Sequence, residues 1–222
     1  MAIMRALKNN GLAVAMFGIF LLSIIGMSVV GWHTENSDLQ EHNQPRQSYG
    51  QYVTSGNFVE AVFENWESEF LQMWALVVLT VFLRQKGSSD SKPMRGKAPQ
   101  DTSSRLSILS ADDWKQRSKA FGHFLYAHSL GLALLSIFVV SFMLHAAGGV
   151  NAYNETARLH GEETLSLLGY VGSSQFWFES LQNWQSEFLA VGTLLVLSIY
   201  LRERGSQQSK PVGKRYNHKT GE

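Results

Sequence analysis

The sequence predicts an all-α fold, a bundle of four transmembrane helices built from two tandem two-helix repeats that share one orientation. Three observations predict this class. The apolar residues gather into four blocks, the two halves of the chain match each other without a gap, and nearly all basic residues fall on one side of the predicted helices. A bilayer core requires about 20 predominantly apolar residues per helix.

The first and third blocks are long enough to cross a bilayer. Residues 11–32 carry no charge, and no Asp, Glu, Lys or Arg occurs between Lys119 and Glu155. The basic start and apolar core of the chain are also typical of a secretory signal, but no small-x-small cleavage site follows them. Because the counterpart in the second repeat lies mid-chain, we expect a retained helix.

The second and fourth blocks, 70–83 and 188–201, are too short alone. Such a block spans about 21 Å as a helix, against a core of roughly 30 Å. Each helix is therefore expected to extend back to a tryptophan, which gives about 27 Å between an outer aromatic residue and a cytoplasmic arginine. The predicted interface anchors are Trp66, Trp184, Arg84 and Arg202.

Ahead of these two spans, aromatic residues recur at helical spacing. In the first repeat Phe58, Val62 and Phe63 take one side, while the opposite side carries acidic residues. The segments 57–66 and 175–184 are therefore predicted to be amphipathic outer helices that lie on or rise from the membrane surface.

A shift of 118 residues aligns the two halves of the chain. Between residues 65–93 and 183–211, 16 of 29 positions are identical, where average residue usage gives about two. The shared sequence is Asn-Trp-x-Ser-Glu-Phe-Leu, followed by Leu-Arg-x-x-Gly-Ser-x-x-Ser-Lys-Pro. The match indicates a duplication. Since each repeat crosses twice, we expect a pseudo-two-fold axis along the membrane normal.

Charge predicts the orientation. Of the 19 Lys and Arg residues, only Arg46 and Arg158 fall in the loops on one face. The positive-inside rule places the other face, with both termini, in the cytoplasm. The predicted domains are a first membrane repeat (1–93), a cytoplasmic linker with an interfacial helix whose cap is residues 110–113 (94–118), a second membrane repeat (119–211) and a basic cytoplasmic tail (212–222).

A polar stripe on the second and fourth helices is the candidate site. The candidate intramembrane residues are Asn65, Ser68, Glu69, Asn183, Ser186 and Glu187. Because polar groups in lipid face the bundle interior, the stripes predict a shared site that contains Glu69 and Glu187. The alternative is that both carboxylates are wetted at the outer interface and only close the first membrane turn. The change from Glu67 to Gln185 predicts that this first acidic position is dispensable.

Several kinds of chemistry are excluded or unsupported. The chain has no cysteine, so it forms no disulfide, thiolate nucleophile or iron–sulfur site. No catalytic motif is present, so we expect no enzyme. His42 and His160 occupy equivalent positions, but no close His-x-x-x-His or Glu-x-x-His pair exists. The histidines are therefore predicted to be solvated or capping, with no metal or other cofactor.

The duplicated segments resemble a family of small uncharacterised bacterial integral membrane proteins, over residues 5–93 and 119–211. The resemblance implies a multi-pass protein of the cell inner (plasma) membrane and brings no activity or cofactor. The expected partners are the lipid bilayer, anionic lipid at the cytoplasmic basic segments, and a membrane protein or a second copy of the chain; nucleic acid is not expected.

Two functions remain open from the residues. One is a small carrier or channel with a site between the second helices of the two repeats. The other is a non-catalytic structural or accessory membrane protein that binds a partner through its outer aromatic helices.

Overall fold

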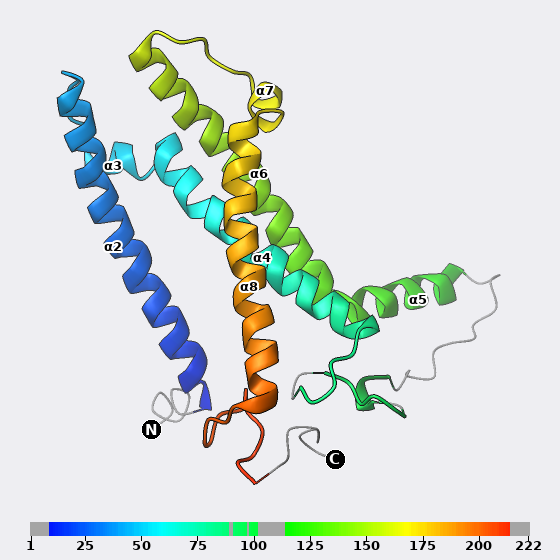
Figure 1. The fold of residues 1–222 in the computed structure, drawn as a ribbon. Helices are drawn as coiled ribbons and strands as arrows, with labels where there is room; N and C mark the ends of the chain where they lie inside the picture. The colour runs from blue at the N-terminus through cyan, green and yellow to red at the C-terminus, as the bar shows by residue number, and fades with distance from the viewer. Residues whose placement is uncertain (1–8, 89–90, 97, 102–113, 214–222) are drawn as a thin grey trace. The chain divides into compact units, whose positions relative to one another are not determined.

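The computed structural model describes residues 9–88, 91–96, 98–101 and 114–213. These residues form α-helices and one short 3-10 helix, and no strand occurs among them (Figure 1), which confirms the all-α prediction. The predicted cap at 110–113 and most of the basic tail lie outside the described residues. The four long helices are α2 (Gly11–Glu41), α4 (Gly56–Phe82), α6 (Ser129–His160) and α8 (Ser174–Tyr200).

Three short helices and a 3-10 turn connect the long ones. They are α3 (Tyr49–Tyr52), η1 (Pro99–Asp101), α5 (Trp114–Ala127) and α7 (Leu167–Val171). The outer segments 57–66 and 175–184 lie inside α4 and α8, so the prediction that they are helical is confirmed. Each of these helices has 27 residues, a length of about 40 Å.

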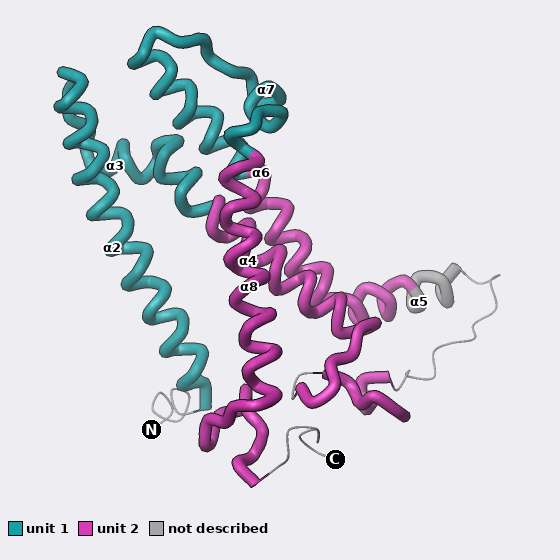
Figure 2. Tube along the Cα trace, viewed as in Figure 1, with its two compact units in different colours: residues 1–63, 144–176 teal, residues 64–143, 177–222 magenta. Residues whose placement is uncertain are grey.

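The chain divides into two compact units (Figure 2). Unit 1 comprises residues 1–63 and 144–176, and unit 2 comprises residues 64–143 and 177–222. The division passes through α4, α6 and α8, so each of these helices contributes to both units.

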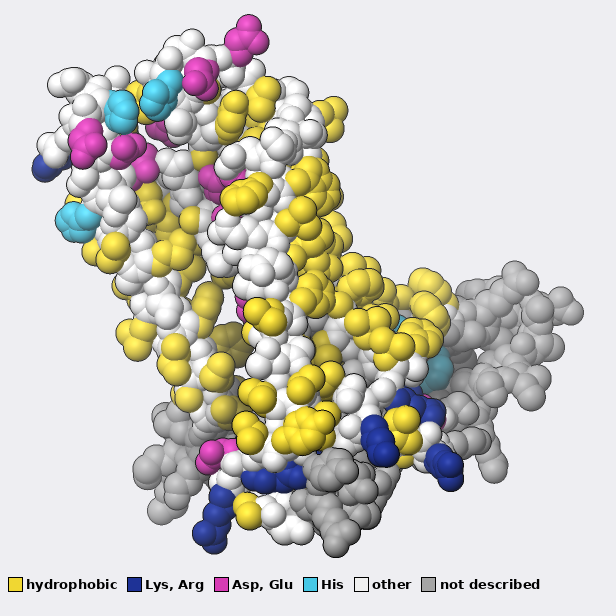
Figure 3. Space-filling view, in the orientation of Figure 1, with side chains coloured by type: hydrophobic (Ala, Val, Ile, Leu, Met, Phe, Trp, Pro, Cys, Tyr) yellow, Lys and Arg dark blue, Asp and Glu magenta, His cyan; other side chains and the backbone are white. Residues whose placement is uncertain are grey.

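Two helices, α2 and α6, are long and apolar enough to cross a membrane, judged by length and composition among the described residues. In their most apolar windows, 6% of α2 and 22% of α6 is buried within the protein. The space-filling view shows apolar side chains along the shaft of α2 in unit 1, with acidic and histidine side chains gathered at its end (Figure 3). In unit 2, apolar side chains cover α6 and α8, and Lys and Arg gather beyond the end of α8.

In unit 1, glycines let the first turns of α4 approach α6 closely. An ideal Cβ at Gly148 would lie 2.6 Å from the backbone nitrogen of Glu60, and one at Gly56 would lie 2.6 Å from that of Ala152. Only glycine permits two helix backbones to come this near. The contact fixes Glu60 against the second half of α6.

The connections that follow α2 and α6 are built alike. Asn36 donates to the carbonyl of Gln47 at 3.1 Å and accepts from its backbone N–H at 2.8 Å. Asn154, which lies 118 positions later, makes the same two bonds with Leu165 at 2.9 and 2.7 Å. One asparagine in each connection therefore holds the chain in place with paired bonds before the next short helix begins.

The segments that end α4 and α8 also adopt one turn. Gly87 and Gly205 have φ angles of 87° and 86°, which glycine adopts without steric cost. The backbone N–H of Gln85 donates to Ser91 Oγ at 2.8 Å, and that of Glu203 donates to Ser209 Oγ at 2.9 Å. The Leu-Arg-x-x-Gly-Ser-x-x-Ser-Lys-Pro sequence thus encodes a helix stop.

Candidate functional site

In unit 2, four polar side chains join α4 to α8 and form what we call the Glu67 cluster: Glu64, Glu67, Asn183 and Trp184. The indole Nε1 of Trp184 donates to Glu67 Oε1 at 2.9 Å, and Asn183 Nδ2 donates to Glu64 Oε1 at 2.6 Å. The two carboxylates are three residues apart, so α4 presents them on one face. The contact between α4 and α8 is therefore polar at this level.

Glu67 is fully buried, with 0% of its surface exposed. Burying a carboxylate is costly unless hydrogen bonds compensate for the lost water, and the bond from Trp184 supplies one. Ser68 and Gln72 are also buried on α4, at 2% and 6% exposure. Buried polar groups therefore continue for more than one turn along α4.

The six candidate intramembrane residues predicted from the polar stripe differ in how far they are buried. Ser68 is buried and Asn183 is half-buried, whereas Asn65, Glu69 and Ser186 are exposed. Glu187 is half-buried, and its carboxylate is near enough to that of Glu69 for the two charges to interact.

The face of α4 that is buried differs from the face along which the polar stripe was predicted. It runs through Glu64, Glu67, Ser68 and Gln72 rather than through Asn65 and Glu69. This face was not predicted from the sequence, because Gln185 stands at the equivalent position of α8 and the difference indicated that the acid at Glu67 is dispensable. The spacing of Glu64 and Glu67 on the side of α4 opposite the aromatic residues was the available signal.

The predicted interface anchors also make specific contacts. Trp184 is the donor to Glu67 described above, so it contributes to the helix contact as well. Trp66 is half-buried. Arg84 donates to the carbonyl of Met94 at 3.1 Å, and Arg202 donates to the carbonyls of Ser198 and Ile199 at 3.3 and 3.1 Å. The arginines therefore bind free carbonyls at or after the helix ends.

Unit 1 holds a second cluster, in which polar and aromatic side chains meet; we call Glu60, His145, Tyr170 and Phe176 the Glu60 cluster. Tyr170 Oη donates to Glu60 Oε1 at 3.0 Å. The His145 ring stacks on Phe176 with 4.9 Å between centroids and 29° between planes, and a ring nitrogen lies within 4.8 Å of a Glu60 carboxylate oxygen. His145, Tyr170 and Phe176 are at most 1% exposed. The prediction of solvated or capping histidines is wrong for His145, because it is fully buried against Phe176 of α8 and beside Glu60 of α4.

Acidic side chains near the end of α2 influence one another. Burial raises the pKa of Glu35; a hydrogen bond from Asn57 opposes this shift, and the charges of Glu155 and Asp38 add to it. Burial, together with the Glu35 charge, raises the pKa of Tyr52. This end of unit 1 is therefore an acidic surface with little basic compensation.

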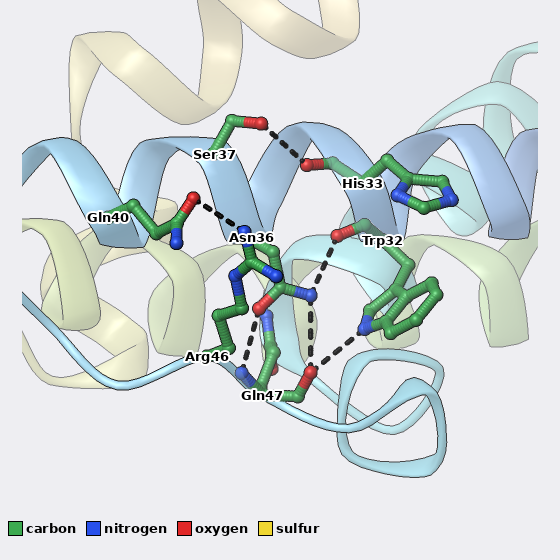
Figure 4. A pocket seen from close by; sticks show the side chains of 7 residues that line it. All are labelled: Trp32, His33, Asn36, Ser37, Gln40, Arg46 and Gln47. Atoms are coloured by element: carbon green, nitrogen blue, oxygen red, sulfur yellow. Dashed lines mark hydrogen bonds between the residues drawn. The ribbon is translucent and has the colours of Figure 1, made fainter.

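A hollow of about 170 Å³ lies beside α2 in unit 1 (Figure 4). Its lining residues are Trp32, His33, Asn36, Ser37, Gln40, Arg46 and Gln47. The Gln47 carbonyl accepts from both the Trp32 indole and Asn36, and Arg46 donates to Gln40. These hydrogen bonds hold the segment that follows α2 against the helix beside the hollow.

His42 and His160 are capping residues, as the sequence predicts. Each ring nitrogen Nδ1 lies against the backbone carbonyl four residues earlier, at 3.0 Å from that of Asp38 and 2.9 Å from that of Thr156. The two rings are also neighbours, with centroids 5.5 Å apart. The two histidines lie 118 positions apart, at equivalent places in the two halves of the sequence.

Comparison with known proteins identifies one family. A family model described as "Domain of unknown function (DUF6766)" matches residues 3–222. No curated protein and no solved structure matches the chain.

Proposed function

Because the chain belongs to the DUF6766 family, whose function is unknown, we propose its function from the site itself: a small membrane carrier or channel for protons or other small cations. The Glu67 cluster is its centre, with Glu67 and Glu64 as the cation-binding groups and Trp184 and Asn183 as the residues that position them. The buried Glu67 carboxylate is the observation that carries the proposal.

The proposal requires four membrane spans in two same-orientation repeats, with both termini in the cytoplasm. Its support is that α8 begins and ends 118 residues after α4, and that the asparagine bonds and glycine turns recur at the same spacing. In this topology α4 crosses from Trp66 to Arg84, so Glu67 lies just inside the outer end of the span.

A carboxylate inside a membrane protein is expensive to keep and commonly marks an ion or proton pathway. Glu67 differs from a simple interfacial carboxylate because its whole surface is covered and an indole donates to it. Buried Ser68 and Gln72 extend the polar path toward the cytoplasmic end of α4.

The charge distribution favours a cation over an anion. On the proposed outer side, twelve acidic residues face only two basic ones, Arg46 and Arg158. A mouth of one charge sign concentrates ions of the opposite sign. The acidic residues are Glu35, Asp38, Glu41, Glu60, Glu64, Glu67, Glu69, Glu155, Glu162, Glu163, Glu179 and Glu187.

Flux into proteoliposomes tests this function. Purified protein is reconstituted with a trapped pH-sensitive dye, and proton entry is followed after a pH jump, with and without an alkali-cation gradient. We expect flux above that of empty vesicles, and its loss in Glu67→Gln, which keeps the shape and can still accept from Trp184. Glu203→Gln, at an exposed position after α8 and outside the acidic residues of the mouth, is the matched control and keeps wild-type flux. Vesicles that behave like empty ones with the wild-type protein would refute the proposal.

One observation favours an accessory role instead. On the part of α8 in unit 2, Trp177, Phe178 and Leu181 are 41%, 65% and 54% exposed. Such an aromatic face suits either lipid or a membrane-protein partner. Stable co-purification of one partner from native membranes, abolished by Phe178→Ala, together with no flux, would favour this second function.

A further inference from the structure

The His42–His160 pair, at the ends of α2 and α6, belongs to unit 1, whereas the Glu67 cluster belongs to unit 2; the pair has no part in the proposed transport. We propose that these two histidines form a binding site for a borderline divalent metal ion of the Zn²⁺ type. The inference does not depend on the carrier proposal.

Ring spacing is the first argument. The His42 and His160 centroids are 5.5 Å apart, with 74° between the ring planes. Two imidazoles that bind one tetrahedral Zn²⁺ through bonds of about 2.0–2.1 Å hold their centroids roughly 5 Å apart. The rings are therefore already near the separation that one shared ion requires.

The second argument is the tautomer. A backbone carbonyl is only an acceptor, so the bonds from Nδ1 to the Asp38 and Thr156 carbonyls place the ring hydrogen on Nδ1 in both neutral imidazoles. Nε2 then carries the lone pair in each ring. Metal-bound histidines commonly donate their other ring N–H to a backbone carbonyl in this way, which orients the ring and strengthens the ligand.

Access and charge provide the third argument. His160 is exposed, and the His42 side chain is 36% exposed, so an ion from solution can reach both rings. An Asp38 carboxylate oxygen lies 3.8 Å from His42 Nδ1, and Glu41 and Glu162 neighbour the two histidines in sequence. Imidazole selects Zn²⁺, Cu²⁺ or Ni²⁺ over Mg²⁺ and Ca²⁺, while the acidic surroundings lower the cost of bringing a dication to the site.

Capping explains the Nδ1 contacts, but it does not require the two rings to be adjacent. A helix cap needs only its own carbonyl, so each histidine could cap alone. Adjacent rings with the same tautomer and both Nε2 lone pairs available are what distinguishes a ligand pair from two independent caps.

The test is a Zn²⁺ titration of the purified full chain in detergent, measured by calorimetry. The protein is purified through an affinity tag that contains no histidine. We expect one saturable site per chain, weakened about tenfold or more by either His42→Gln or His160→Gln, since each change removes one of two protein ligands. The double variant should lose the saturable site altogether, because neither imidazole ligand remains. His33→Gln, which alters an exposed histidine on α2 outside the pair, should bind as the wild type does.

A second measurement needs no variant, in case a substitution disturbs folding. Wild-type protein is treated with diethyl pyrocarbonate with and without Zn²⁺, and modified histidines are located by mass spectrometry of peptides. Protection of His42 and His160 together, with His33 still modified, supports the site. Absence of saturable Zn²⁺ binding, wild-type affinity in either single variant, or protection elsewhere would overturn it.

Discussion

The sequence Asn-Trp-x-Ser-Glu-Phe-Leu occurs in α4 and again in α8, yet the two copies have different surroundings in unit 2. In α4 its third and fourth residues, Glu67 and Ser68, are buried. In α8 the corresponding residues, Gln185 and Ser186, are exposed. There Asn183 and Trp184 donate hydrogen bonds to Glu64 and Glu67 of α4. In these two hydrogen bonds α4 supplies the acceptors and α8 supplies the donors.

This difference shows how a repeated sequence can build an asymmetric contact. If α4 and α8 faced each other symmetrically, Trp66 would bond to Gln185 as Trp184 bonds to Glu67. The rotation that buries the acid of one copy leaves its counterpart on the surface. Glu67 and Gln185 therefore have different environments although they occupy equivalent positions, and the prediction that this acidic position is dispensable remains to be tested by substitution.

The largest expected effect comes from removing the buried carboxylate. Glu67→Ala should lower the free energy of unfolding by about 3 kcal/mol, because it leaves a cavity where a buried carboxylate stood and removes the acceptor of the half-buried Trp184 indole. Gln185→Ala should change it by less than about 0.5 kcal/mol, as exposed positions usually do. Denaturant unfolding of both variants in the same detergent measures the difference. Equal losses would contradict the asymmetry.

The serine that follows gives a smaller contrast. Ser68→Leu forces a larger side chain into the filled contact and should cost about 2 kcal/mol, whereas Ser186→Leu adds an apolar group to an exposed face and should cost almost nothing. Thermal unfolding of the pair, read by far-ultraviolet circular dichroism, is sufficient. A less stable Ser186→Leu would show that the exposed side of α8 is covered in solution.

The asparagines should reverse this order, because here α8 carries the contact. Asn183→Ala removes the donor to Glu64 and should cost about 1 kcal/mol, while Asn65→Ala alters an exposed residue and should fall within about 0.5 kcal/mol of wild type. Comparison of their denaturation midpoints checks this. If Asn65→Ala proved the more harmful, the pairing of α4 and α8 would need a different register.

How much of this could be predicted from sequence depends on what each feature requires. Helix existence followed from composition, and the turns after α4 and α8 followed from Gly87 and Gly205, because local backbone chemistry determines both. The rotation of α4 could not be predicted, since a difference of one residue moves a side chain by about 100° and only the packed partner selects the face. His145 was missed for the same reason: its neighbours come from distant parts of the chain.

The smallest expected effect is a dependence of stability on pH. It concerns only the first half of the chain, because the position equivalent to Glu35 in the second half is Tyr153. Burial raises the Glu35 pKa above its ordinary 4.5 in the folded protein, so the folded state binds the proton more tightly than the unfolded state. The stability due to this proton is present below pH 4.5 and is lost as pH rises through the raised pKa. Unfolding temperatures between pH 4 and 7 should therefore decline less in Glu35→Gln than in wild type; a matching decline would contradict the shift.

The most direct test of the central claim exchanges the acid between the two copies. Glu67→Gln combined with Gln185→Glu keeps the composition and net charge but moves the carboxylate from the buried face of α4 to the exposed face of α8. Proton flux is then measured in proteoliposomes beside wild type and Glu67→Gln. We predict that the exchanged protein folds and conducts no better than Glu67→Gln, because the buried environment beside Trp184 defines the site. Recovery of wild-type flux by the exchanged protein would contradict the account.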